Sequence, residues 1–411
     1  MNDTLQNLMR EATRLTQSGN LMEATNAIQR ALRNSSEMDD LSATRKTNQA
    51  PTPAAPAPTQ RAPVILDGCV FEMTHARPPE TAMSDSAMSD AAETDTAETV
   101  TAQPDAAKTV TAGVTQWNAT QAQGKFTEGS YTHGSLTRTY KLYTPPDASD
   151  IGLPLVVMLH GCTQNPDDFA AGTGMNGRAR EQGFYVLYPA QSADANPQRC
   201  WNWFKHTHQS RGRGEAALLA SMTLSIIERH GIDPRRVYIA GLSAGGAMAA
   251  IVAAAYPEIY AAVGVHSGLA VGAASNVSEA LAAMKSGAKS LQTAPRNAVP
   301  TIVFHGDQDH TVHPRNGEQV SQQVIASVQG ATGGQAITKS SSQGVSSGGR
   351  RFTRSEHHSA ATGQIVGEHW LVGGAGHAWA GGSTAGSYTD PKGPDATGEM
   401  LRFFMAQKQP V

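Results

Sequence analysis

Short blocks of hydrophobic residues alternate with amphipathic stretches from residue 124 to residue 408. Helical spacing recurs over 167–183, 214–232 and 244–260. Between these stretches lie blocks with the length and composition of buried strands: LPLVVMLHG (153–161), FYVLYPA (184–190), RRVYIAGL (235–242), AAVGVHSG (261–268), VPTIVFHGD (299–307) and GEHWLVGG (367–374). Strands that alternate with helices predict an α/β fold, a doubly wound and mostly parallel sheet with helices on both faces. In such a sheet the chemistry lies at the carboxyl ends of the strands.

The segment that precedes the first buried strand has a different pattern. Residues 126–146 alternate between apolar and polar side chains and contain glycine turns, which predicts an opening antiparallel hairpin.

The N-terminal part of the chain contains two segments that differ in pattern and composition. Residues 1–34 carry two apolar stripes at helical spacing, separated by SGN at 18–20, and predict a short helical hairpin. A single hairpin cannot bury its own apolar face, so it must pack on its own domain, on a second copy or on a partner. Residues 35–123 are rich in Pro, Ala, Thr and Asp and too poor in large apolar groups to offset chain entropy. We therefore predict a disordered linker there and a catalytic domain over 124–408.

Composition excludes several kinds of partner. The chain has 32 Lys and Arg against 35 Asp and Glu, a formal net charge of -3, and no cationic cluster, which speaks against a nucleic-acid surface. No apolar run approaches the roughly 18 residues of a membrane span. A basic segment followed by an apolar core, the mark of a secretory signal, is not visible. We therefore expect a cytoplasmic protein.

The chain has three cysteines, Cys69, Cys162 and Cys200. In a reducing compartment they are expected to be idle thiols. The alternative is a bond between Cys162 and Cys200, because both lie near the candidate site in sequence. None of the three has the local context of a nucleophile.

Ser243 is the candidate nucleophile. It stands in GLSAG, residues 241–245, between a predicted buried strand and an alanine-rich helix. That is the strand–turn–helix setting of the G-x-S-x-G motif, in which a sharp turn exposes the hydroxyl and requires small neighbours. The alternative, an incidental serine in a glycine-rich or phosphate-binding turn, is disfavoured because the pattern G-x-x-x-x-G-K-[ST] is missing.

A serine hydroxyl needs a base, and the base needs an acid. His377 follows the last predicted strand in a glycine-rich loop, whereas its rivals His266 and His369 fall within or near strands. Asp309 lies in the loop after another buried strand and is the favoured acid. Its neighbour Asp307, closer to the strand end, is the alternative and is expected to brace the turn. The order Ser, Asp, His along the chain is that of the α/β-hydrolase fold.

Two backbone N–H groups are expected to stabilise the oxyanion of the reaction intermediate. One belongs to Ala244, directly after the nucleophile. The second is expected from the loop HGCTQNPDD after the first buried strand, at Cys162, with Thr163 as the alternative. His160 is expected to support this loop. We expect no cofactor, and the histidines near Asp309 lack the ligand spacing of a metal site.

Several stretches resemble the poly(3-hydroxybutyrate) depolymerase family of esterases, which is related to feruloyl and acetylxylan esterases. They span about residues 125–406 and include HGCTQ, GMNGRAREQGFYVLYPAQ, CWNWF, RRVYIAGLSAGGAMA, HGDQDHTVHP and GAGHAWAGG. The resemblance implies an α/β-hydrolase fold and, by position, the triad Ser243, Asp309 and His377. It also implies a Cys162–Cys200 disulfide and places Trp203 and Trp379 near the substrate cleft, with plain packing as the alternative for both rings.

The resemblance implies hydrolysis of carboxylic esters through an acyl-enzyme, with poly(3-hydroxybutyrate) or its oligomers as the expected substrate. The alternatives are a feruloyl, acetylxylan or short-chain carboxylesterase, or a peptidase on the same fold. Secretion, as in the extracellular depolymerases, stays open. The helical hairpin is expected to tether the enzyme to a polymer granule or a partner. A scaffold with an inactive hydrolase domain is disfavoured because the triad and the oxyanion loop are complete in the sequence.

Overall fold

The structure is a computed structural model that describes residues 123–146, 148, 152–291, 299–331, 333–334 and 336–410. The helical hairpin predicted for 1–34 and nearly all of the linker predicted for 35–123 lie outside these residues. The predicted catalytic domain lies almost entirely within them.

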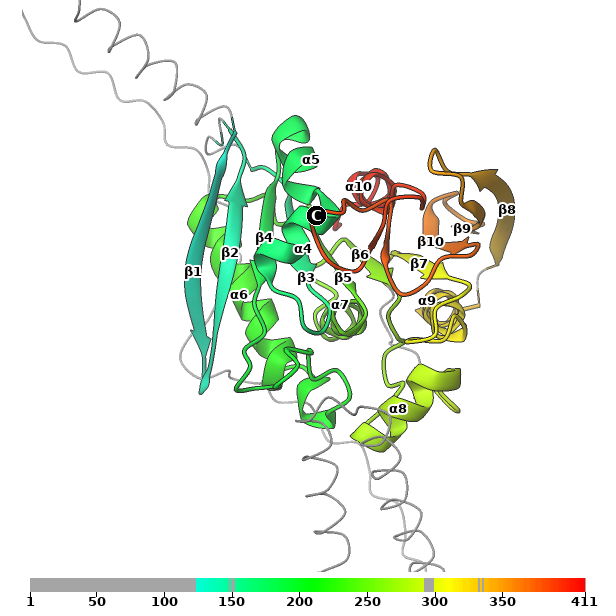
Figure 1. The fold of residues 1–411 in the computed structure, drawn as a ribbon, viewed down its shortest axis with the longest axis horizontal. Coiled ribbons are helices and arrows are strands. Elements are labelled where there is room, and N and C mark those ends of the chain that lie inside the picture. The colour runs from blue at the N-terminus through cyan, green and yellow to red at the C-terminus, as the bar shows by residue number, and fades with distance from the viewer. Residues whose placement is uncertain are drawn as a thin grey trace, which may run out of the picture. The chain divides into compact units, whose positions relative to one another are not determined.

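The described residues form one large sheet and a second, two-stranded one (Figure 1). In spatial order, the large sheet consists of β1 (Lys125–His133), β2 (Leu136–Thr144), β4 (Tyr185–Pro189), β3 (Leu155–Leu159), β5 (Val237–Leu242), β6 (Ala262–His266), β7 (Thr301–Gly306), β10 (Ile365–Val372), β9 (Arg351–Ser359) and β8 (Ile337–Val345). The small sheet pairs β11 (Trp379–Ala380) with β12 (Thr389–Asp390).

The centre of the large sheet is parallel and its two margins are antiparallel. The pairs from β4 through β3, β5, β6 and β7 to β10 are parallel. The hairpins β1–β2 and β8–β9 close the two margins in antiparallel pairing. The carboxyl ends of β3, β5, β6, β7 and β10 therefore meet along one edge of the sheet. The loops that carry the candidate site residues follow these strand ends.

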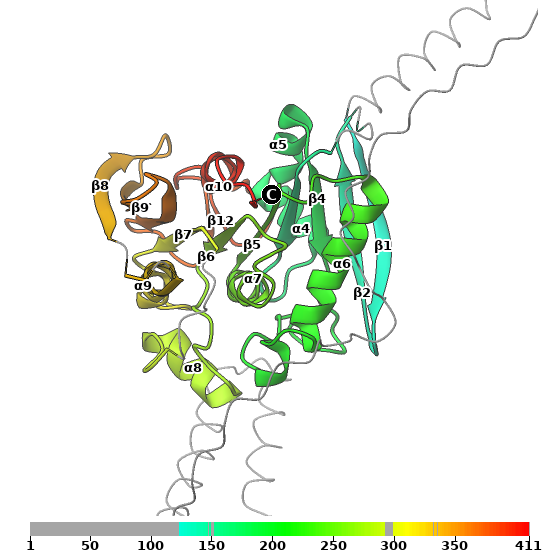
Figure 2. The same cartoon turned by 180° about the vertical axis from the view of Figure 1, so that it is seen from behind.

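Helices cover both faces of the sheet, and two hydrophobic cores result. Side chains alternate along β3, so that Val157 packs in one core and Val156 in the other. The first core includes residues of α6 (Gly214–His230), α7 (Ala244–Ala255) and α8 (Val277–Ser286), and Val320 of α9 (Arg315–Ala331). The second includes α4 (Pro166–Thr173), α5 (Met175–Gln182) and α10 (Ala396–Met405). Figure 2 shows the same arrangement from behind.

The predicted fold class is confirmed. The opening hairpin is β1–β2, and the six hydrophobic blocks are β3, β4, β5, β6, β7 and β10. The hairpin β8–β9 and the helices α8, α9 and α10 were not predicted from the sequence. Most residues of β8 are exposed, so this edge strand carries no hydrophobic pattern. None of the described helices is long and apolar enough to cross a membrane.

Candidate active site

Ser243 occupies a sharp turn between β5 and α7. Its φ of 57° and ψ of -119° lie outside the regions that an L-residue adopts without strain. The residue is 8% exposed, and its backbone N–H donates to the carbonyl oxygen of His266 at 2.8 Å. The tight packing of the surrounding backbone holds the strained conformation in place.

The two glycines of the motif have a visible steric reason. A Cβ on Gly241 would lie 2.7 Å from the carbonyl oxygen of Leu159, and one on Gly245 would lie 2.6 Å from that of His160. Both distances are shorter than real Cβ contacts. The turn therefore packs directly against the end of β3, and the small residues predicted around the serine are required.

His377 and Asp309 are joined by a hydrogen bond between Nδ1 and Oδ2, 2.7 Å long. Asp309 is buried, and its Oδ1 accepts the N–H groups of Thr311 and Val312 at 2.9 and 2.8 Å. Burial alone would raise the pKa of Asp309. Interactions with His305, His377 and the Val312 N–H outweigh it and hold this pKa well below its usual range. Asp309 is therefore ionised at neutral pH and fixes the tautomer of His377 that leaves Nε2 unprotonated.

The rival acid and the rival bases have other tasks. Asp307 accepts the backbone N–H of Gly374 at 2.7 Å and braces the turn, as expected. Burial lowers the pKa of His266 to about 3 and that of His369 to about 4. Within the described residues neither imidazole forms a hydrogen bond with Asp307 or Asp309.

His266 links the serine turn to the loop that carries His377. Its carbonyl oxygen accepts from Ser243, and its Nε2 accepts the Ala380 N–H at 2.9 Å. The described contacts thus join Asp309 to His377 directly and bring Ser243 to the same loop through β6. A hydrogen bond between the Ser243 hydroxyl and the His377 ring is not among those of the described residues. Such bonds are often long before substrate binds.

Of three consecutive N–H groups in the loop after β3, two have an acceptor within the protein. The Thr163 N–H is occupied by the carbonyl of Gln198 at 2.7 Å, and the Gly161 N–H by Oε1 of Gln164 at 2.9 Å. No acceptor in the described part of the chain takes the Cys162 N–H. The Ala244 N–H opens α7, where the first N–H groups have no acceptor within the helix. Thr163 is therefore the weaker of the two residues considered for this loop.

Two further contacts hold this loop in place. His160 accepts the Gln191 N–H on Nε2 at 3.1 Å, which leaves Nδ1 to donate to the Gly161 carbonyl at 2.7 Å. Burial lowers the pKa of His160 to about 4, so the ring stays neutral. A disulfide joins Cys162 to Cys200. His160 therefore supports the loop, as expected.

The two tryptophans expected at the cleft lie in the cores. Trp379 is 1% exposed, stacks on His266 and donates its indole N–H to Oγ1 of Thr397 at 3.0 Å. Both its face and its N–H are used by the protein, and its contact with substrate stays a prediction. Trp203 is also buried, with 4% exposed, and packs edge-on against Phe204. For Trp203, contact with substrate stays a prediction.

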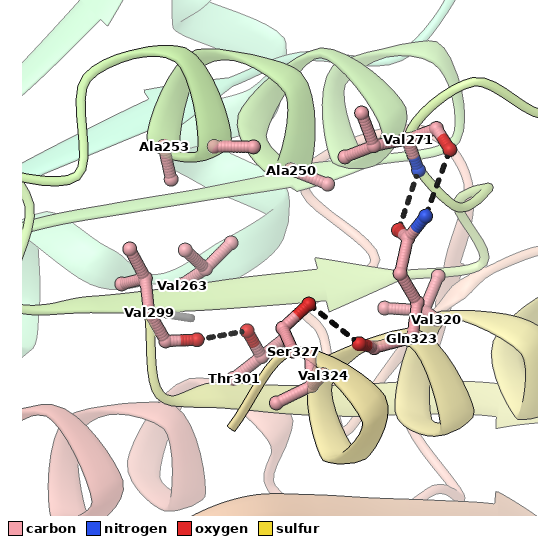
Figure 3. Close-up of a pocket in the computed structure, with 11 residues that line it drawn as sticks. Ala250, Ala253, Val263, Val271, Val299, Thr301, Val320, Gln323, Val324 and Ser327 are labelled. Atoms are coloured by element: carbon pink, nitrogen blue, oxygen red, sulfur yellow. Dashed lines mark hydrogen bonds between the residues drawn. The ribbon is translucent and has the colours of Figure 1, made fainter. Parts of the chain in front are cut away.

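One small cavity is lined mostly by apolar side chains. It measures about 40 Å³ and lies between α7 and α9, close to the first residues of β6 and β7 (Figure 3). Alanine and valine side chains line most of it, and the hydroxyls of Ser327 and Thr301 bond to the carbonyls of Gln323 and Val299. It lies toward the opposite ends of the strands from Ser243. In the described ranges no group of three or more His, Cys, Asp or Glu is placed to hold a metal ion.

Four residues that hold the loop after β3 were not predicted from the sequence. Gln164 and Asp168 bond to one another and to Ser387, and Tyr388 reaches Thr163. Gln164 and Asp168 lie within the stretch that was already predicted to carry the oxyanion donor. Tyr388 follows in a loop of glycines and serines whose path over the sheet the sequence does not reveal.

Comparison with known proteins agrees with this geometry. Residues 138–342 match the family described as Esterase PHB depolymerase. The match includes Ser243 and Asp309 and ends before His377.

Two curated relatives share about a third of the aligned residues. Poly(3-hydroxyalkanoate) depolymerase C of Paucimonas lemoignei is 34% identical over 190 residues, which cover 43% of this chain and 46% of that protein. Feruloyl esterase B of Thermothelomyces thermophilus is 31% identical over 196 residues, 43% of this chain and 66% of that protein. The chain thus spans about half to just under two thirds of the length of these relatives.

A solved structure shows the same fold. Acetyl xylan esterase from Aspergillus awamori superimposes with a TM-score of 0.51 and 18% sequence identity, over 68% of this chain and 99% of that one. This similarity shows that the two proteins share a fold, in this chain a mostly parallel sheet with helices on both faces.

Proposed function

Residues 138–342 match the PHB depolymerase family of esterases, and from this premise we propose that the protein is a serine esterase with the triad Ser243, Asp309 and His377. The observation that carries the proposal is the bond between Asp309 and His377, at the strand edge where the Ser243 turn also lies. No cofactor enters the proposed mechanism.

The mechanism follows from the roles of these groups. The Ser243 hydroxyl attacks the ester carbonyl while Nε2 of His377 takes its proton. Asp309 stabilises the imidazolium that forms. The N–H groups of Cys162 and Ala244 donate hydrogen bonds to the oxyanion and stabilise its negative charge. The proton on His377 then passes to the leaving alcohol, and water, activated by the same imidazole, releases the acyl group from Ser243.

The proposed substrate is poly(3-hydroxybutyrate) or its oligomers. The similarity to a poly(3-hydroxyalkanoate) depolymerase supports it. The similarity to a feruloyl esterase and an acetylxylan esterase supports the second candidate, a carboxylesterase on smaller esters. A peptidase on the same fold is the least supported of the three. Specificity depends on the pocket rather than on the fold or the triad.

A panel of substrates tests the proposal. Wild type is compared with Ser243→Ala on amorphous poly(3-hydroxybutyrate), hydroxybutyrate oligomers, p-nitrophenyl esters, feruloyl sugars and peptide amides. Ser221→Ala is the control, since its hydroxyl donates within α6 to Ala217. We expect ester hydrolysis in wild type and the control and none in Ser243→Ala. Hydrolysis of small esters without any release from the polymer or its oligomers would favour the second candidate.

We also propose that the predicted helical hairpin at 1–34 tethers the enzyme to a polymer granule. The amphipathic spacing of the sequence supports this role. Deletion of residues 1–120 is expected to release the enzyme from granules in cell fractions while activity on soluble esters is kept. An unchanged distribution and unchanged polymer turnover would contradict the tether. Fractionation of the same cells also tests the expected cytoplasmic location.

A further inference from the structure

Tyr388 is an exposed aromatic residue in a strained conformation. It is 46% exposed, and its φ of 51° lies in the left-handed region that favours glycine. The other described non-glycine residues with positive φ are Thr163, Arg199, Ser243 and Ser267. A strained residue persists only where its surroundings fix it, and such residues gather at functional sites.

The backbone of Tyr388 is fixed to the loop of His377. Its carbonyl oxygen accepts the N–H of Trp379 at 2.7 Å, and Trp379 is two residues beyond His377. Directly after Tyr388, β12 pairs with β11. The main chain at this position therefore lies against the loop that supplies the proposed base.

The side chain of Tyr388 is fixed to the loop that supplies the proposed oxyanion donor. Its hydroxyl lies 3.1 Å from Oγ1 of Thr163, and that Oγ1 donates to the carbonyl of Cys162 at 2.6 Å. Because a threonine hydroxyl has a single proton, the tyrosine O–H is the donor to Thr163. The phenol therefore supports the loop that places the Cys162 N–H.

The residue before Tyr388 is anchored as well. The N–H and the hydroxyl of Ser387 donate to the two oxygens of Asp168, at 2.8 and 2.6 Å. Gln164 donates to Asp168 at 2.8 Å and accepts from Gly161. Ser387 is thereby joined through side chains to the start of α4 and to the loop after β3, so Tyr388 has little freedom to move away.

The strand order places Tyr388 at the same edge of the sheet as Ser243. The loop that its hydroxyl contacts follows β3, and the loop that its backbone contacts follows β10. Between these strands lie β5, β6 and β7, and Ser243 stands at the end of β5. A residue that contacts both loops therefore lies at the edge that carries the proposed triad, and the exposed part of its side chain can contact a ligand there.

We propose that Tyr388 is a specificity-determining residue, whose ring provides the apolar surface on which the acyl group of a bound ester lies. This inference rests on the proposed esterase activity. The phenol ring contributes apolar contact area. Each methylene of the acyl chain that the ring covers increases the affinity of the enzyme for the transition state. The hydroxyl has the separate role of supporting the oxyanion loop.

The test compares p-nitrophenyl butanoate with p-nitrophenyl acetate. In Tyr388→Gly we expect the ratio of kcat/KM between the two esters to fall about tenfold, mainly through KM for the butanoate. In Tyr388→Phe we expect the ratio to stay at that of wild type while kcat on both esters falls about threefold, since the bond to Thr163 is lost. Leu281→Ala, at an exposed apolar position on α8, is the control.

Stability separates this role from a structural one. Glycine accepts the left-handed backbone without strain, so Tyr388→Gly is expected to keep the Tm of wild type. An unchanged ratio in a folded Tyr388→Gly would overturn the inference. If that variant does not fold, the ratio in Tyr388→Asn decides, because asparagine also tolerates this conformation. Lack of hydrolysis of either ester by wild type would contradict the proposed function instead.

Discussion

The backbone N–H of Ser243 donates to the carbonyl oxygen of His266, and the distance is 2.8 Å. The imidazole of the same histidine accepts from Ala380 at 2.9 Å. One residue at the end of β6 therefore holds the serine turn and the base loop together. This role requires a neutral imidazole, because Nε2 must keep its lone pair for the Ala380 N–H.

Acid is expected to destabilise the protein through buried histidines. Burial lowers the pKa of His266 to about 3 and that of His160 to about 4, whereas an unfolded histidine has a pKa of about 6.5. The unfolded state therefore binds protons first as the pH falls. The stabilisation is complete above about pH 6.5 and is lost as the pH falls toward these folded-state values, by about 1.4 kcal/mol per pH unit for each histidine. Urea unfolding midpoints between about pH 7 and pH 4 measure the loss.

Replacing one of these histidines measures its contribution to the pH dependence of stability. His266→Gln keeps an acceptor for Ala380 and removes the titration, so the dependence of the unfolding free energy on pH should become shallower by about 1.4 kcal/mol per unit. His310→Gln, at an exposed position, is the control. Equal slopes in wild type and His266→Gln would contradict the assignment.

Asp309 and Asp307 form a matched pair for testing the acid. Asp309→Asn should lower kcat by about 10⁴-fold, because the amide disturbs the tautomer of His377 that acts as base. Asp307→Asn keeps an acceptor for Gly374 and should leave kcat within about threefold of wild type. Steady-state kinetics on one p-nitrophenyl ester measures both. The reverse order of effects would assign the acid to Asp307.

The disulfide between Cys162 and Cys200 is expected to affect both stability and activity. It links residues 38 positions apart, for which chain entropy gives a stabilisation of about 4 kcal/mol. It also restrains the residue whose N–H is the proposed oxyanion donor, so its loss should lower kcat by about tenfold or more. Urea unfolding and kinetics of the double variant Cys162→Ser, Cys200→Ser measure the two effects. Cys69→Ser is the control, and a double variant with the kcat of wild type would contradict the role of Cys162.

The sequence predicts the parts of this fold that bury apolar side chains. The strands β3 to β7 are short, largely apolar runs because helices cover them on both faces. The polar edge strand β8, with Ser340, Ser341 and Ser342 exposed, carries no such pattern. Pairing with β9 forms this strand, and a hydrophobic pattern does not show which polar segments pair.

For the site, motifs and strand ends predict where reactive groups stand. Ser243 and the bond between Asp309 and His377 follow from loops at the ends of parallel strands. The direction of a ring does not follow from its neighbours in sequence. Trp379, two residues from the base, points into the core, while Tyr388 stands at the surface because a distant threonine and a backbone N–H hold it there.

Reaction with a fluorophosphonate probe, followed by mass spectrometry of the labelled peptides, shows whether Ser243 is the nucleophile. We expect one label, on Ser243, in the wild type. We expect no label in Ser243→Ala and a labelling rate at least about 10³-fold lower in His377→Ala, which lacks the base that activates the hydroxyl. Labelling of Ser243→Ala at the rate of wild type, or a label on another residue, would contradict this role of Ser243.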